Sequence, residues 1–112
     1  MVTQPVTNTD TRVEVKRSFY MTFNGKRSYC HIPNLLLGPR SAKLTVKYEQ
    51  GDEECYFLVS EDGLYFTGAV CTEDDNRVIF RKWISGKNIL LAGSWKCGGR
   101  EGEWYIEGKL CN

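Results

Sequence analysis

Cys30 and His31 are the residues whose types could support nucleophilic catalysis, because a thiol beside an imidazole can form a thiolate nucleophile. His31 is the one histidine of the chain. Neighbouring residues of a strand point to opposite faces, so the pair cannot share a hydrogen bond if both lie in a regular strand. The sequence therefore predicts Cys30 as a small buried side chain and His31 as a surface imidazole.

Carboxylates gather in three short segments, Asp52 to Glu54, Glu61 to Asp62 and Glu73 to Asp75. A glycoside hydrolase would need two of them facing each other across a cleft, and a calcium loop would need oxygen ligands spread over a longer segment. We expect solvated turn residues instead. The glycine-rich segment 97–102 precedes a strand pattern, whereas phosphate-binding loops usually open a helix, so it predicts a hairpin loop. These patterns predict that the protein is not an enzyme.

The cysteines are too widely spaced to predict a metal centre. The five, with no C-x-x-C pair among them, are Cys30, Cys55, Cys71, Cys97 and Cys111. Zinc sites usually contain close ligand pairs, so we expect no metal and no cofactor. The N-terminus lacks the apolar run of a signal peptide, which favours a cytoplasmic protein with reduced thiols. The alternative is a secreted form whose signal peptide was removed, with two disulfides and one free thiol.

Charge and length limit the partners. Lys and Arg number 15 against 14 Asp and Glu, a net charge of +1, so no nucleic-acid partner is expected. No segment approaches the roughly 20 apolar residues of a membrane span, so no membrane partner is expected either. The 112 residues predict a flexible tail over residues 1–11 and a single all-β domain over 12–112, with a homo-oligomer left open.

Three segments repeat one formula on alternate residues: large apolar, large apolar, glycine, large apolar. They are Leu64, Phe66, Gly68 and Val70; Ile89, Leu91, Gly93 and Trp95; and Trp104, Ile106, Gly108 and Leu110. Alternate residues of a strand share a face, so each set predicts the core face of a strand. Glycine at the same place in each strand allows the sheet to bend or to pack closely there. This curvature favours closure of the sheet.

About eight strand-like segments follow one another with short turns. They cover residues 12–23, 26–32, 43–48, 54–60, 64–71, 77–84, 89–96 and 103–110. This spacing predicts an antiparallel meander that forms a small closed or nearly closed β-barrel, with a β-sandwich as the alternative. Leu35 to Leu37, bracketed by Pro33 and Pro39, are expected in a loop or a helical turn that plugs one end.

Asn24 and Gly25 predict a two-residue type I′ hairpin turn. That register pairs Tyr20 with Tyr29 and Phe19 with Cys30. It predicts a core face that holds Phe19, Met21, Phe23 and Cys30. It also predicts an outward aromatic and basic face that holds Tyr20, Arg27, Tyr29 and His31.

The expected architecture resembles the small up-and-down barrels of the avidin and lipocalin groups. The segment Gly63 to Gly68, Gly-Leu-Tyr-Phe-Thr-Gly, is similar to the Gly-x-Phe-Thr-Gly element of the avidin family. The likeness covers only these few residues, and the flanking residues depart from that family's pattern. It therefore implies no biotin site.

Aromatic residues are the strongest pointers to function. Trp95 and Trp104 follow the core pattern and flank segment 98–102, so we expect them near one barrel end, while Trp83 lies on the face opposite Phe80 and Lys82 points inward. These four residues predict a non-catalytic module that binds a small molecule or a glycan at one end of the barrel. The alternative is a protein-interaction module of the inhibitor or immune-evasion type. It would act through Tyr20, Arg27, Tyr29 and His31, or through an exposed Leu35–Leu37 segment.

Overall fold

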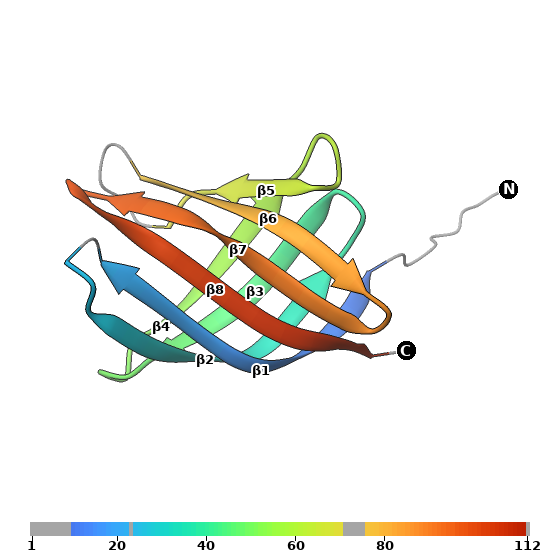
Figure 1. The fold of residues 1–112 in the computed structure, drawn as a ribbon, viewed down its shortest axis with the longest axis horizontal. Helices are drawn as coiled ribbons and strands as arrows, with labels where there is room; N and C mark the ends of the chain where they lie inside the picture. The colour runs from blue at the N-terminus through green and yellow to red at the C-terminus, as the bar shows by residue number, and fades with distance from the viewer. Residues whose placement is uncertain (1–9, 23, 71–75, 112) are drawn as a thin grey trace, which may run out of the picture.

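The computed structural model describes residues 10–22, 24–70 and 76–111. These residues form eight antiparallel strands that close into a barrel in the order of the sequence (Figure 1). The strands are β1 (Thr11–Thr22), β2 (Arg27–Leu37), β3 (Ser41–Tyr48), β4 (Glu53–Val59), β5 (Tyr65–Gly68), β6 (Arg77–Ser85), β7 (Asn88–Cys97) and β8 (Arg100–Cys111). The predicted meander barrel is confirmed, and the sandwich alternative is wrong.

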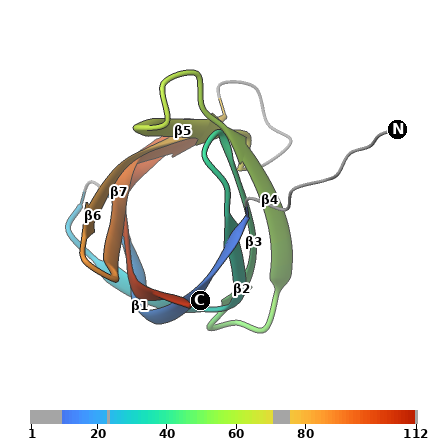
Figure 2. The ribbon, with the colours of Figure 1, turned by 90° about the vertical axis from the view of Figure 1, so that its right-hand side faces the viewer.

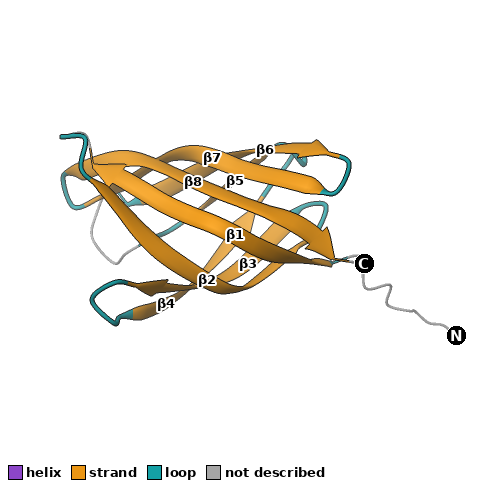
Figure 3. Cartoon of the chain, turned by 60° about the horizontal axis from the view of Figure 1, so that its bottom comes forward, coloured by secondary structure: helices purple, strands orange, loops and turns teal. Residues whose placement is uncertain are grey.

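The barrel closes through β1 and β8, which pair from Arg12 with Cys111 to Thr22 with Gly102. Figure 2 looks along the barrel and shows the strands arranged as a ring. Figure 3 shows strands joined by loops, with no helix in the described part of the chain. Residues 10–22, 24–70 and 76–111 therefore contain no long apolar helix of the kind that spans a membrane.

Alternate residues of each strand fill the barrel interior with apolar side chains. The interior residues with at most 1% exposure include Leu35, Val46, Leu58, Phe66, Val78, Phe80, Leu91 and Ile106. Period-two burial is clear in β3, where the buried residues Ala42, Leu44 and Val46 alternate with exposed Lys43, half-buried Thr45 and exposed Lys47. One continuous core therefore runs along the barrel axis.

The repeated glycines lie where neighbouring strands approach closely. A Cβ atom at Gly93 would overlap the carbonyl oxygen of Ile79 on β6. At Gly68 it would lie 2.5 Å from the carbonyl oxygen of Phe57, and at Gly108 2.6 Å from that of Glu14. The predicted close packing at all three glycines is therefore present in the barrel.

The structure corrects the expectation for Leu35 to Leu37, which belong to β2 rather than to a loop. A shift of register between His31 and Asn34 lets the strand pass Pro33, because a bulge accommodates a residue that has no N–H to donate. Leu35 and Leu37 are then 0% and 5% exposed in the core. They offer no exposed leucine surface.

The register predicted for the first hairpin is wrong by one residue. Phe19 pairs with Tyr29 and Tyr20 with Ser28. The N–H of Gly25 donates to the carbonyl oxygen of Thr22 and Gly25 has a φ of 87°, which fits a three-residue loop with a left-handed glycine. Phe23 lies outside the described residues.

This one-residue shift exchanges the two predicted faces of β1. Ser18 and Tyr20 point into the barrel, where Ser18 is 2% exposed and contacts Cys30. Phe19 lies on the outer face, where Tyr29 and Tyr105 cover it. Outer packing therefore leaves Phe19 only 8% exposed.

The shortest strand, β5, makes the weakest seam of the barrel. A single pair, Val59 with Thr67, joins it to β4. Before it, the Asp62 carboxylate accepts hydrogen bonds from the N–H groups of Leu64 and Tyr65, so the turn extends through Leu64. Leu64 is consequently 45% exposed, against its predicted core position.

Candidate ligand-binding site

Five aromatic rings gather inside one end of the barrel, near the hairpins β1–β2, β3–β4 and β7–β8. We call them the aromatic cluster: Tyr20, Tyr48, Tyr56, Trp95 and Trp104. The centroid of the Tyr20 ring lies 5.9 Å from that of Tyr48, 6.0 Å from Trp95 and 6.3 Å from Trp104. All three pairs are edge-to-face, the arrangement that ring quadrupoles favour.

The aromatic cluster lines a cavity of about 360 Å³. Its mouth is polar and carries Gln50, Asp52, Glu54 and Arg100. The volume lies within the range of about 300–1,000 Å³ that is typical of small-molecule sites, towards its lower limit. An apolar interior with a few polar groups at the mouth is the usual build of such a site.

Hydrogen bonds hold several polar atoms of the cluster in place. The hydroxyl oxygens of Tyr48 and Tyr56 lie 2.6 Å apart. Trp104 donates its Nε1–H to Ser18 Oγ at 3.0 Å, and Ser18 Oγ lies 3.1 Å from Cys30 Sγ. The tyrosine pair connects β3 to β4, and Ser18 connects β1 to both β2 and β8.

The Nε1–H of Trp95 is different, because it is buried without an acceptor among the described residues. Trp95 is 9% exposed and lines the cavity. A buried donor that lacks an acceptor typically costs about 1–3 kcal/mol. A ligand oxygen or ring nitrogen at Trp95 would remove that cost.

Burial disfavours ionisation of three side chains at this end of the barrel, Tyr48, Tyr56 and Cys30. It raises the pKa of both Tyr48 and Tyr56, and for Tyr48 the hydrogen bond with Tyr56 raises the pKa further. Burial also raises the pKa of the Cys30 thiol, which outweighs the opposite effect of the Ser18 hydrogen bond. These three side chains are therefore neutral hydrogen-bonding groups at physiological pH.

The four predicted ligand-binding residues do not come together. Trp95 and Trp104 line the cavity. Lys82 does point inward, but its Nζ lies 5.4 Å from the centroid of the Phe66 ring, towards the opposite end of the barrel. Trp83 is on the outer face and 45% exposed. Two of the four predicted residues, Trp95 and Trp104, therefore line the cavity.

The predicted interaction surface is also divided. Arg27, Tyr29 and His31 lie on the outer face of β2, and His31 is exposed as expected. Tyr20 lies inside the barrel, since the hairpin register differs by one residue. Cys30 and His31 are on opposite faces, as the strand alternation predicts.

The sequence patterns do not identify Tyr48, Tyr56 or Arg100 as site residues. The alternation of β3 assigns Tyr48 to the same face as Leu44 and Val46, and that signal identifies it as an inward residue. No pattern in the sequence shows that Tyr56 on β4 and Trp104 on β8 are neighbours, with ring centroids 6.0 Å apart. That proximity results from barrel closure.

Within the described residues, no group of three or more His, Cys, Asp or Glu side chains could hold a metal ion. Cys97 is disulfide-bonded, whereas Cys30, Cys55 and Cys111 are free thiols. Cys71 lies outside the described residues. No protein-family model matches the chain, and no curated protein resembles it significantly.

Proposed function

We propose that this protein is a non-catalytic binding module that holds a small molecule, or one residue of a glycan, in the aromatic cavity. The observation that carries the proposal is Trp95, which lines a cavity of about 360 Å³ and whose buried Nε1–H has no acceptor among the described residues. Buried polar groups in proteins nearly always have partners. A bound ligand would supply the missing one.

The cavity favours a ligand with a flat ring and at least one hydrogen-bond acceptor. The ring would pack among the aromatic side chains, and the acceptor would face Trp95. Polar groups at the other edge of the ligand would meet Asp52, Glu54 and Arg100 at the mouth. Both signs of charge are present there, so neither a strongly anionic nor a strongly cationic ligand is required.

The alternative, a protein-interaction module, has less support from these residues. Arg27 and Tyr29 remain available on the outer face, but Tyr20 points inward and Leu35 and Leu37 are buried. The cavity is therefore the better-supported site.

Native mass spectrometry of the protein purified from its own host tests the proposal. The expected result is a retained small-molecule mass that is lost on denaturation. Trp95→Phe keeps a ring but removes the N–H. It should weaken ligand binding about two- to tenfold, as expected for one hydrogen bond between neutral groups, and so lower the retained fraction. Trp83→Phe is the matched control, because Trp83 is 45% exposed on the outer face.

The proposal fails if the wild-type protein carries no small molecule and binds no member of a fragment library in ligand-observed NMR. It also fails if a retained ligand is unaffected by Trp95→Phe.

A further inference from the structure

A second concave surface lies on the outside of the barrel, over β7. Its floor is made of small residues, Ala92, Gly93 and Ser94, and it encloses about 450 Å³. Tyr65 and Trp83 form one wall, and Tyr105 forms the other. Small side chains between aromatic ones leave room for a flat group.

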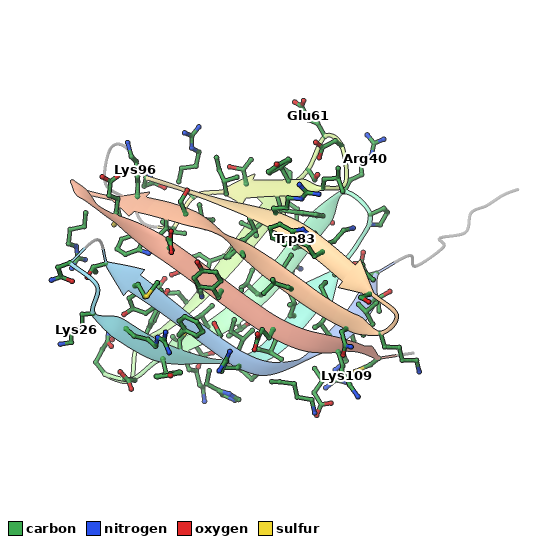
Figure 4. The ribbon with its side chains drawn as sticks, in the orientation of Figure 1. Lys26, Arg40, Glu61, Trp83, Lys96 and Lys109 are labelled. Atoms are coloured by element: carbon green, nitrogen blue, oxygen red, sulfur yellow. The ribbon has the colours of Figure 1, made fainter. Side chains whose placement is uncertain are left out.

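Strand pairing explains why these residues are neighbours. Ala92 on β7 pairs with Arg81 on β6 and with Tyr105 on β8. Arg81 in turn pairs with Tyr65 on β5. The four residues therefore form one row across four strands on the outer face. Figure 4 shows the side chains that cover this face, with Trp83 labelled.

Arg81 is the cationic group of this surface. Its Cζ lies 4.9 Å from the ring centroid of Trp83 and 5.7 Å from that of Tyr65. Among the described residues, its buried Nε–H has no acceptor and Arg81 forms no ion pair. A guanidinium group typically binds a carboxylate through two parallel hydrogen bonds.

The opposite wall carries acceptors. Glu103 Oε1 accepts a hydrogen bond from the Tyr105 hydroxyl at 2.9 Å, and Ser94 on the floor is exposed. A ligand with a carboxylate at Arg81 would therefore find acceptors for hydroxyl groups on its other side. The aromatic walls would pack against the ring between them.

We propose that this outer surface, which is distinct from the aromatic cavity, binds an acidic sugar residue of the uronic-acid type, with the carboxylate on Arg81. The surface is shallow and open to water, which suits a ring whose hydroxyl groups stay hydrated. A purely apolar ligand, in contrast, gains the most binding free energy in a closed pocket that excludes water. An acidic pyranose uses the aromatic wall, the guanidinium and the carboxylate of Glu103 together.

The test compares two probes that differ only in the carboxylate, methyl β-D-glucuronide and methyl β-D-glucoside. Titrations of ¹⁵N-labelled protein are followed through the Nε–H resonance of Arg81 and the backbone amides of β6 and β7. The glucuronide should bind at least about tenfold more tightly, because a hydrogen-bonded charge pair usually contributes more than a neutral one.

Two variants separate binding from folding. Arg81→Gln should remove the preference for the glucuronide. Arg81→Lys keeps the positive charge but should lose much of that preference, since lysine cannot form a bidentate pair with a carboxylate. Trp95→Phe serves as the control for the cavity and should leave glucuronide binding unchanged. The urea unfolding midpoint of each variant establishes that it is folded.

Equal affinity for the two glycosides would overturn the proposal, as would a glucuronide preference that survives Arg81→Gln. Benzoate is the third probe. If it binds more tightly than the glucuronide at the same resonances, the surface selects aromatic carboxylates and the sugar assignment is wrong. None of these three results tests the aromatic cavity, because ligand binding there is tested separately with Trp95→Phe.

Discussion

Replacing Gly93 by alanine should destabilise the barrel far more than an ordinary glycine substitution. The new Cβ would overlap the carbonyl oxygen of Ile79, and would lie 2.7 Å from the Ile79 carbonyl carbon and 2.9 Å from Phe80 Cα. These atoms are backbone, so no side-chain rotation relieves the overlap. The strand β6 must move away from β7 instead.

The magnitude follows from what that movement disrupts. Overpacking costs about 1–3 kcal/mol, and loss of two ladder hydrogen bonds near Phe80 adds about 1 kcal/mol each. We therefore expect a loss of about 3–5 kcal/mol from a total that is typically about 5–15 kcal/mol. Gly86→Ala is the control, because Gly86 has open space around it and only its φ of 63° opposes a side chain. That change should cost about 1–2 kcal/mol.

Urea unfolding monitored by tryptophan fluorescence and far-UV circular dichroism measures both variants. Gly68→Ala extends the series, because its Cβ would lie 2.5 Å from the Phe57 carbonyl oxygen on the weak β4–β5 seam. The reasoning is refuted if Gly93→Ala costs no more than Gly86→Ala.

Three further outcomes are expected. Ser18→Ala should cost about 1–3 kcal/mol in urea unfolding, since it leaves the buried Nε1–H of Trp104 without its acceptor; an unchanged midpoint would contradict this. The free energy of unfolding should fall as the pH rises above 10.0, the ordinary pKa of Tyr48, because the unfolded phenol then ionises while the folded one stays protonated. Unfolding at neutral and alkaline pH should show a shallower fall for Tyr48→Phe, and an identical fall in both proteins would count against a raised pKa. With Ellman's reagent on the native protein, the exposed Cys55 should react before Cys30, whose pKa burial raises; equal rates would show that Cys30 is accessible.

Local patterns in the sequence determine the strands and their order. Apolar alternation assigns Leu44 and Val46 inward, and short turns between successive strands leave a meander as the simplest topology. The glycines at 68, 93 and 108 mark the places where a Cβ does not fit. These features depend on residues close together in the chain, so the sequence alone predicts them.

Turn geometry and barrel closure determine the rest. The loop at Gly25 has one residue more than the type I′ turn that Asn-Gly favours, and since strand faces alternate with a period of two, this moved Tyr20 from the outside to the cavity. A bulge at Pro33 likewise turned an expected leucine loop into core strand. The contacts of Tyr56 with Trp104, and of Arg81 with Tyr65, join residues far apart in the chain. Only closure of the sheet brings such residues together. The sequence therefore predicts Trp95 and Trp104 near one barrel end, while the rest of the cavity and the outer surface are visible only in the tertiary structure.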